Sequence, residues 1–330
     1  MEHRTYPEFQ HETGDFDRDV LRTPDIDYFC SASAWSVSAA EALMPERDSW
    51  IYRFGEQWIA LARGISMDGL RYLQPLEAAW GLSCPLIGPN HKDIVKATIG
   101  LVMERQEDWD VLLLTGIPSG SKLFHECMKG FAHHWQVGLG EPTHRNQAIL
   151  DGGIDDYLGR RSTSFRRNLR RVLRRARVEN IQFEKAHQQE PGALFRRILA
   201  VEQKSWKGLS GSGMISLDMK TFYQRMVHRL AAAGRLRVWF ARKAMTDIAY
   251  ILGGVFGNTY RGLQFSYDHA FANLGLGNLC QHHQLLELCD EGIGLYDLGA
   301  QMAYKESWGD HLKTTAALWV YSPRFRFNTI

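Results

Sequence analysis

The chain has 330 residues, a length typical of two packed domains of about 150 residues each. Hydrophobic residues make up 45% of the sequence and aromatic residues 12%, which favours globular domains with apolar cores and excludes a disordered chain. The formal net charge of +2 gives no global field that would indicate a nucleic-acid or membrane partner.

Strand-like and helix-like segments alternate in the first half of the chain. Residues 50–54 and 58–63 predict a hairpin, and the apolar residues of 91–105 recur at helical spacing. The other elements predicted here are a strand ending near Gly88, a strand over 110–115, a helix over 121–130 and a strand over 146–150. The turn-rich segment 151–155 follows, and we place the domain boundary there, giving domains 1–152 and 153–330.

The second half shows a clearer order of elements. We predict helices over 162–177, 192–207, 217–233 and 277–291, and strands over 181–185, 235–242, 248–256, 259–267, 295–298 and 314–321. Thr246-Asp247 and Gly257-Asn258 supply turns between the three consecutive strands. Antiparallel strands that feed a helix and then further strands predict an α+β domain and not a doubly wound parallel sheet. Both halves follow a similar order, which is compatible with a duplicated fold.

A glycine-bearing segment, Asn273-Leu-Gly-Leu-Gly-Asn-Leu279, joins a predicted strand to a predicted helix. Glycine lets the backbone approach a ligand closely, and the open N–H groups of a helix start favour an anion such as a pyrophosphate. A plain tight turn is the alternative. The segment is not a dinucleotide-binding fingerprint, because the third glycine is missing and the preceding strands read as hairpins.

Residues 160–177 hold nine arginines and no acidic residue. At helical spacing, six of them form one basic face, while an apolar stripe can dock on the domain; the six are Arg166, Arg167, Arg170, Arg171, Arg174 and Arg175. Two like charges at i and i+4 on a helix repel each other by roughly a few tenths of a kcal/mol. A phosphate-bearing ligand would relieve this repulsion. The alternative is an ordinary solvated surface. The candidate ligands are a nucleotide-linked substrate, coenzyme A and RNA.

Two further segments carry groups suited to acyl transfer. Glu202 precedes Ser205-Trp206-Lys207, and a carboxylate in a cleft could act as general base toward an amine; a surface carboxylate beside a core tryptophan is the alternative. Tyr304 and Lys305 follow a short strand, where functional side chains gather. Lys305 could neutralise a developing negative charge and Tyr304 could protonate a leaving thiolate, unless the loop is an ordinary connection.

Other chemistries find little support. The five cysteines include no Cys-x-x-Cys pair, and the histidine pairs at 133–134 and 282–283 face different ways on a helix, so we expect no disulfide scaffold and no metal cofactor. No Gly-x-Ser-x-Gly motif indicates a serine nucleophile. The N-terminus shows no basic-then-apolar signal pattern and no apolar run approaches about 18 residues, so we expect a cytoplasmic protein without a membrane span.

The second half resembles the GNAT superfamily of N-acyltransferases, most closely the branch labelled cellulose-biosynthesis CelD-like, which is similar to the Fem aminoacyl transferases. The resemblance spans about residues 155–310 and rests on an ordered set of motifs. These are Ser164–Arg171, Glu202 with Ser205-Trp206-Lys207, Ala249–Gly253, Tyr267-Asp268 through Gly277, Tyr296–Gly299, and Tyr304-Lys305 with Trp308-Gly309. His269-Ala270 stand where the family usually has a proline, which changes the expected loop.

The resemblance implies tandem GNAT-like domains, each with a mixed, mostly antiparallel sheet flanked by helices, and a catalytic second half. It implies that acetyl-CoA or a longer acyl-CoA binds at Phe265, Ser266, Leu274, Gly275, Leu276, Gly277, Asn278 and Leu279. The implied catalytic residues are Glu202, Tyr267, Tyr304 and Lys305. The implied substrate contacts are Arg166, Arg167, Arg170, Trp206, Asp268 and His269.

The expected reaction is N-acyl transfer to a primary amine of a small molecule, sugar nucleotide or peptide. One alternative is a Fem-like transferase that takes its acyl group from aminoacyl-tRNA, which would account for the basic helix. The other is a non-catalytic module that binds anions or nucleic acid. The modest net charge and the lack of paired exposed aromatic residues argue against this last hypothesis.

Overall fold

The computed structural model describes residues 1–325 and divides the chain into two compact units. Unit 1 comprises Met1–His144 and the residues from Thr314 onward, and unit 2 comprises Arg145–Lys313. The prediction of two α+β halves is confirmed, but the boundary differs from the predicted division at residues 152 and 153. Residues 326–330 of the predicted second domain lie outside the described part of the chain.

The last strand explains the different boundary. β14 (His311–Tyr321) pairs antiparallel with β6 (Val111–Pro118) and β7 (Gln136–Leu139), so its pairing partners all come from the first half of the sequence. Conversely, β8 (Thr143–Ile149) pairs antiparallel with β13 (Leu295–Ala300) of the second half. Relative to a single boundary in the sequence, most of β8 therefore belongs to the second unit and most of β14 to the first. The boundary is set by strand pairing between residues more than 140 positions apart.

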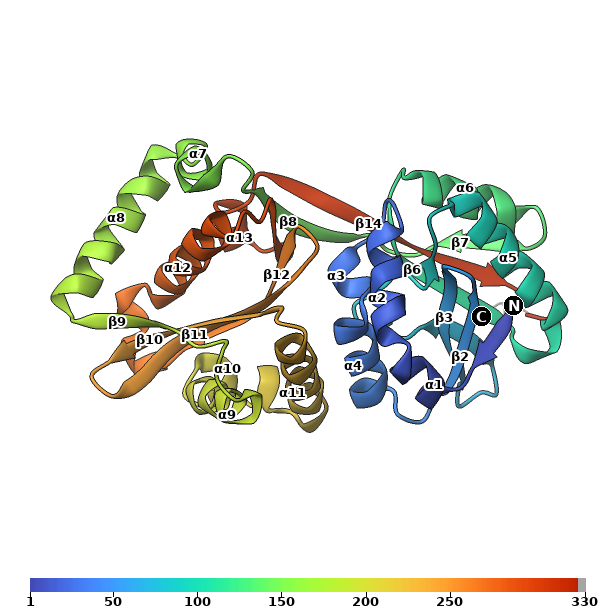
Figure 1. Cartoon of the computed structure of the whole chain (residues 1–330), viewed down its shortest axis with the longest axis horizontal. Helices are drawn as coiled ribbons and strands as arrows, with labels where there is room; N and C mark the ends of the chain where they lie inside the picture. The colour runs from blue at the N-terminus through green and yellow to red at the C-terminus, as the bar shows by residue number, and fades with distance from the viewer. Residues whose placement is uncertain (326–330) are drawn as a thin grey trace. The chain divides into compact units, whose positions relative to one another are not determined.

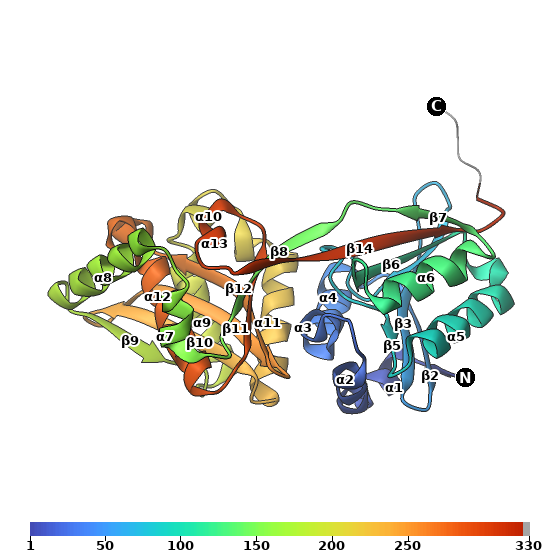
Figure 2. The same cartoon turned by 90° about the horizontal axis from the view of Figure 1, so that it is seen from above.

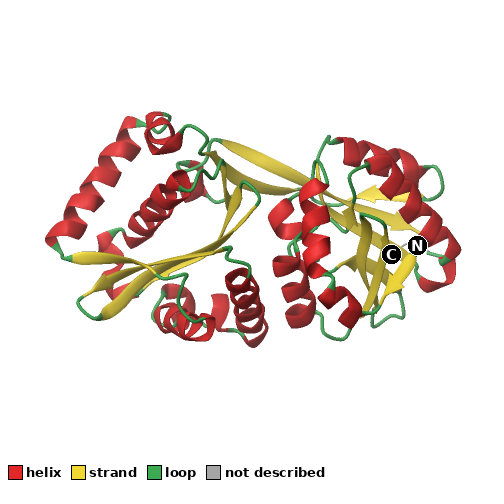
Figure 3. Cartoon of the chain, viewed as in Figure 1, coloured by secondary structure: helices red, strands yellow, loops and turns green. Residues whose placement is uncertain are grey.

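Unit 1 is a mixed sheet with helices on both faces (Figures 1 and 3). Its strands follow the order β1-β2-β3-β4-β6-β14, with β5 on β3 and β7 on β14. The remaining strands are β1 (Glu2–Arg4), β2 (Asp48–Phe54), β3 (Gln57–Ile65), β4 (Arg71–Pro75) and β5 (Leu86–Ile87). The helices are α1 (Tyr6–His11), α2 (Thr13–Arg22), α3 (Tyr28–Ser31), α4 (Ser33–Leu43), α5 (His91–Glu104), the 3-10 turn η1 (Gln106–Asp108) and α6 (Lys122–Ala132).

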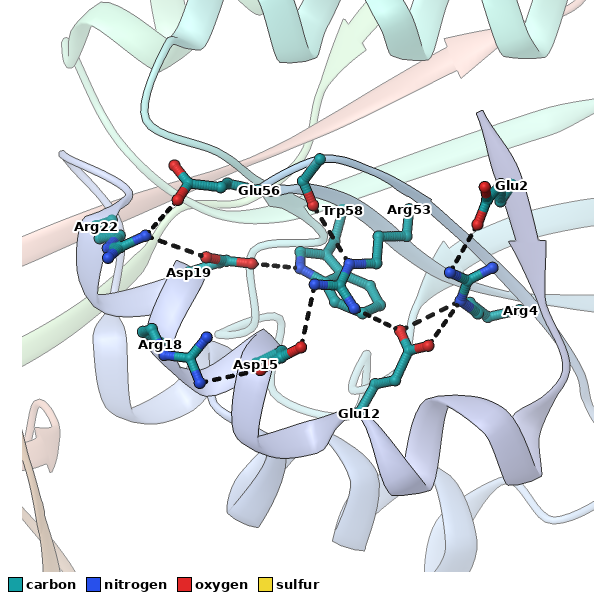
Figure 4. A network of polar contacts seen from close by, with 11 residues as sticks. Glu2, Arg4, Glu12, Asp15, Arg18, Asp19, Arg22, Arg53, Glu56 and Trp58 are labelled. Atoms are coloured by element: carbon teal, nitrogen blue, oxygen red, sulfur yellow. Dashed lines mark hydrogen bonds and ion pairs between the residues drawn. The ribbon is translucent and has the colours of Figure 1, made fainter.

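A network of ion pairs joins α1, α2 and the first hairpin of unit 1 (Figure 4). Arg53 on β2 donates to Glu12 at 2.9 Å and to Asp15 at 3.1 Å, and its guanidinium lies 4.5 Å from the ring centroid of Trp58. Trp58 is buried and donates to Asp19 at 2.9 Å. The buried ring thus anchors a surface network that holds the helices on the hairpin, a structural and not a catalytic arrangement.

Unit 2 is built on strands in the order β8-β13-β12-β11-β10-β9. The strands not yet given are β9 (Ile181–Lys185), β10 (Leu236–Lys243), β11 (Thr246–Phe256) and β12 (Thr259–Tyr267). Every pair is antiparallel except β12 and β13, which run parallel. The expected mixed, mostly antiparallel sheet is therefore present.

Helices cover both faces of the unit 2 sheet (Figure 1). One face carries α7 (Gly153–Gly159), α8 (Thr163–Val178), η3 (His269–Leu274) and α12 (Leu276–Asp290), and the other carries α9 (Pro191–Glu202), α10 (Trp206–Leu209), η2 (Gly213–Ile215) and α11 (Leu217–Ala232). α13 (Ala303–Glu306) follows β13. In the view from above, α10 and α13 overlap, whereas Figure 1 shows them well apart (Figures 1 and 2). Among residues 1–325, none of the helices combines the length and apolar character that a membrane crossing requires.

Two local predictions in unit 2 are wrong. The helix expected over 192–207 ends at Glu202, because the Ser205 hydroxyl caps a separate short helix by accepting from the Gly208 N–H at 3.2 Å. The turn expected at Thr246-Asp247 lies two residues earlier, where Ala244 adopts φ 53°. A local cap at Ser205 and the left-handed backbone at Ala244 therefore set these boundaries.

The helix predicted over 162–177 is present as α8, with bounds that differ by one residue at each end. Ser162 caps the helix, and its hydroxyl accepts from the Phe165 N–H at 3.2 Å. Leu169, Val172 and Ala176 are buried at helical spacing and pack in a core with β10, β11 and α12. The apolar stripe thus docks the helix and leaves the arginines on its outer face.

Candidate active site

Strands β12 and β13 separate partway along their length. Their parallel pairing covers only three residue pairs, from Thr259 opposite Leu295 to Arg261 opposite Asp297. Beyond these pairs β12 continues to Tyr267 while β13 turns toward β8. The C-terminal half of β12 therefore keeps its antiparallel partner β11 but has no strand partner on its other edge among the described residues. Such an edge offers backbone donors and acceptors to an extended ligand.

The start of α12 lies beside this open edge. Gly275 precedes the helix with φ 71°, in the left-handed region that favours glycine, and no side chain among the described residues caps the helix. A Cβ on Gly275 would lie 2.8 Å from Val172 of α8, and one on Gly277 would lie 2.8 Å from the Phe265 ring. Glycine at these two positions lets the loop pack between α8 and β12, and the uncapped N–H groups suit an anion.

The eight residues predicted to hold the acyl donor fall at this junction. Phe265 and Ser266 lie on β12, Leu274 ends η3, and the others begin α12. Leu274, Leu276 and Leu279 are buried in the core, so their contribution to a ligand would come from the backbone. The predicted helix start is corrected by one residue, from Gly277 to Leu276.

The arginines of α8 divide into two groups. Arg166 is half-buried and donates to the carbonyl oxygens of Leu158 and Gly159, at 3.3 and 3.0 Å, so it serves to hold the end of α7. Arg175 donates to the Asn273 carbonyl oxygen at 3.1 Å, which ties the helix to the loop before Gly275. The rest of the group is exposed and forms no ion pair with an acidic side chain within residues 1–325; it consists of Arg167, Arg170, Arg171, Arg174 and Arg177.

Lys305 lies at the other side of the splay, on α13. Its ammonium group donates to the Ala300 carbonyl oxygen at 3.1 Å. Burial lowers the pKa of Lys305 to about 8, with a further contribution from the Arg261 guanidinium. A Cβ on Gly299 would lie 3.3 Å from both the Lys305 and the Arg261 nitrogens, so these two cations flank the same small space. A half-buried ammonium in this position can stabilise a negative charge that develops beside it.

Of the two predicted catalytic tyrosines, only Tyr304 shares this side of the splay. Its ring meets the Phe265 ring edge-on, with centroids 6.0 Å apart, and burial raises the pKa of its phenol. The phenol therefore stays protonated at neutral pH and can donate. Tyr267, at the end of β12, instead packs against the apolar core beneath α8.

Glu202 lies in a different environment from the cleft in which a general base was expected. The side chain has no exposed surface, and one carboxylate oxygen accepts from the Tyr250 phenol at 2.8 Å. The other oxygen lies 3.7 Å from the ammonium of Lys207. Gly213 lies directly over this oxygen, where a Cβ would come within 2.6 Å of it. The carboxylate is thus enclosed and paired, which favours a role in holding Lys207.

Lys207 is the principal residue that the sequence reasoning missed. Its ammonium donates to the Gln264 side-chain oxygen at 2.9 Å and to the Phe265 carbonyl oxygen at 3.2 Å. Arg261 and Asp297 were also absent from the predicted site, although a charged residue inside each apolar strand is a signal of a buried ion pair. Lys207 appeared in the sequence only as part of the Ser205-Trp206-Lys207 motif and was given no role.

The remaining predicted substrate contacts are scattered. Trp206 is 60% exposed on α10, near Lys207. Asp268 caps the η3 turn by accepting from the Ala270 N–H at 2.9 Å, and the His269 N–H donates to the Lys204 carbonyl oxygen at 3.0 Å. Within residues 1–325, no three metal-binding side chains of the His, Cys, Asp or Glu type gather at one point.

Comparison with known proteins agrees with this geometry. Residues 163–306 match the family model described as an acetyltransferase (GNAT) domain. Unit 2 therefore contains a GNAT domain, as the order of its motifs predicted. Among curated proteins, none matches the chain in sequence.

Solved structures extend the likeness to both units. FemX aligns with 96% of this chain and 97% of its own, at a TM-score of 0.68 and 12% identity. A conserved protein of unknown function from Bacteroides thetaiotaomicron VPI-5482 aligns with 93% of this chain and 97% of its own, at a TM-score of 0.64 and 10% identity. A tandem GNAT protein from the clavulanic acid biosynthesis pathway aligns with 96% of this chain and 97% of its own, at a TM-score of 0.50 and 12% identity. The chain thus has a tandem GNAT fold; identities this low carry no further statement about activity.

Proposed function

We propose that this protein is an N-acyltransferase that moves an acyl group from acyl-CoA to a primary amine of a small molecule, sugar nucleotide or peptide. The observation that carries the proposal is the separation of β12 from β13 beside the glycine-bearing start of α12. An extended pantetheine arm would bond the open edge of β12, and the pyrophosphate would meet the N–H groups of Leu276, Gly277 and Asn278. The carbonyl of the thioester would then lie in the splay, within reach of α13.

The residues around the splay suit the chemistry of acyl transfer. A neutral amine attacks the thioester carbonyl, the C–N bond forms, and negative charge develops on the carbonyl oxygen. In its protonated form, Lys305 stabilises that charge. When the C–S bond breaks, the Tyr304 phenol can deliver a proton to the leaving thiolate. Glu202 is enclosed, so we propose that the proton lost by the amine passes to water and not to this carboxylate.

Isothermal titration with acetyl-CoA and with longer acyl-CoAs tests the proposal directly. Binding that weakens when Gly275 is replaced would support the donor site, and a screen of amines with a thiol-release assay would then identify the acceptor. If no acyl-CoA binds at millimolar concentration, the proposal is wrong.

A second candidate donor, aminoacyl-tRNA, is favoured by one specific observation. The exposed arginines of α8 extend along the helix, well beyond the contact of Arg175 with the loop before Gly275. Successive cations along a helix can follow a nucleic-acid backbone, and their binding would weaken steeply with salt. Transfer that requires charged tRNA and does not occur with acyl-CoA would select this donor.

A further inference from the structure

A buried polar network lies under the open half of β12. It joins one side chain from each of five elements, α9, α10, α11, β11 and β12; the residues are Glu202, Lys207, Tyr223, Tyr250 and Gln264. Tyr250 donates to Glu202 at 2.8 Å, Lys207 donates to Gln264 at 2.9 Å, and Gln264 donates to Tyr223 at 2.9 Å. All five side chains are shielded from solvent or half-buried, so the network is held in one geometry and not averaged by water.

Lys207 connects this network to the main chain of β12. Its bond to the Phe265 carbonyl oxygen fixes the direction of that carbonyl. Because the peptide unit is planar, the same bond fixes the direction of the Ser266 N–H, which belongs to the same unit. A second link lies at the end of the strand, where the His269 N–H donates to the Lys204 carbonyl oxygen at 3.0 Å. The segment from Glu202 to Lys207 is therefore fastened to the edge that has no strand partner.

The charge state of Lys207 follows from its surroundings. Its ammonium donates to the Gln264 oxygen and to the Phe265 carbonyl oxygen, and it lies 3.7 Å from the Glu202 carboxylate. Burial lowers the pKa of Lys207 below the ordinary lysine value, and Glu202 partly offsets this effect. All three neighbours are acceptors, so they favour the ammonium over a neutral amine, which would turn a lone pair toward one of them.

We propose that Lys207, which lies beside the Tyr250–Glu202 pair, is a positioning residue of the acyl-transfer centre: it orients the Phe265–Ser266 peptide on the open edge of β12. The proposal rests on the proposed function for its role in transfer. In this proposal Glu202 supports Lys207 and takes no part in the acid–base chemistry. It accounts for a buried ion pair that an ordinary apolar core would not need.

The test compares three variants of the full chain. Lys207→Met removes the ammonium but leaves the Glu202 carboxylate buried without its cation, which can destabilise the fold. The double variant Lys207→Met with Glu202→Gln removes both charges and keeps the volumes similar, so it keeps the proposal testable. Lys204→Met is the matched control, because Lys204 is an exposed lysine three residues away whose side chain forms no ion pair within the described residues.

One readout does not depend on turnover. Amide hydrogen exchange at Ser266 should be faster in the double variant than in the wild type, because the Phe265 carbonyl of the same peptide has lost its bond to the Lys207 ammonium. A double variant with the wild-type Ser266 exchange rate would overturn the proposal.

Turnover supplies the second readout. With a working acceptor, kcat/KM of the double variant should fall by about 10- to 100-fold, the loss typical of a misplaced reacting group, while Lys204→Met should match the wild type. If the wild-type protein transfers no acyl group, the proposed function fails, but the exchange experiment still decides whether Lys207 orients the Phe265–Ser266 peptide.

Discussion

Arg261 and Asp297 form a buried ion pair of 2.5 Å at the last position where β12 and β13 are paired. The Asp297 carboxylate also accepts from Arg145 at 2.5 Å and from the Gly299 N–H at 2.8 Å. The point at which the strands begin to separate is thus held by charge and not by apolar packing. A buried ion pair is strongly directional, so it can hold two strands together at one residue and let them diverge at the next.

Replacement of Asp297 by Asn should therefore destabilise unit 2. The change keeps the shape of the side chain but removes the carboxylate that two guanidinium groups share, and breaking a buried pair in this way costs about 3–5 kcal/mol. Urea denaturation followed by far-UV circular dichroism measures the loss. Asp290→Asn, at an exposed site on α12, is the control. A loss at Asp297 no larger than at Asp290 would show that the ion pair contributes little.

Replacement of Gly275 by Ala should weaken both the fold and donor binding. Gly275 and Gly292 share φ 71°, but a Cβ on Gly292 would meet nothing within 4 Å, whereas one on Gly275 would lie 2.8 Å from Val172. Gly292→Ala therefore reports the backbone strain alone, about 1 kcal/mol. Gly275→Ala should lose more stability than this control and should raise the Kd for acyl-CoA, measured by calorimetry. Equal losses of stability in the two variants would mean that Val172 of α8 moves aside without a loss of free energy.

The rate of transfer should fall above pH 8 if protonated Lys305 stabilises the oxyanion. Its pKa of about 8 lies below the ordinary value because of burial and the nearby Arg261, so the ammonium is present below pH 8 and is lost above it. A pH–rate profile of kcat/KM measures the descending limb. In Lys305→Arg the limb should disappear, because a guanidinium stays charged, whereas a limb that persists would assign it to another group.

The same shift makes a prediction for stability. The folded pKa of Lys305 is depressed, so between about pH 8 and the ordinary lysine value the unfolded chain binds more protons and stability should rise with pH. Lys305→Met should thus be more stable than the wild type at pH 7, and the difference should shrink as the pH approaches 10.5, the ordinary value for lysine. Thermal melts at several pH values measure it; a constant difference would contradict the shift.

Charge reversal on α8 should separate the two candidate donors. Arg167→Glu, Arg170→Glu and Arg174→Glu change exposed residues that do not support the fold. If RNA binds this face, affinity should fall by orders of magnitude, and the dependence of log Kd on log salt should become shallower by about one unit for each phosphate that the helix no longer neutralises. Filter binding with tRNA, and calorimetry with acyl-CoA, measure the two cases. Arg196→Glu with Lys220→Glu, on the opposite face, is the control.

Much of unit 2 could be predicted from local signals. A few adjacent residues are enough to indicate each of three features: the Ser162 cap and apolar stripe of α8, the consecutive strands β10 to β12, and the glycines at the start of α12. Capping, periodicity and turn chemistry act over such short distances, which is why their bounds were found to within a few residues. The ordered motifs from Arg166 to Trp308 were enough to predict a GNAT domain.

What the local signals could not reveal depends on segments far apart in sequence. Only the tertiary structure places β14 in unit 1, encloses Glu202 beneath Gly213, and brings Lys207 to the Phe265 carbonyl. A carboxylate near a helix end looks alike in the sequence whether it faces solvent or a buried lysine, because burial is decided by the chain that packs over it. The sequence by itself thus determined the class of fold and predicted where a donor would bind, whereas long-range packing decided which side chains lie around that proposed site.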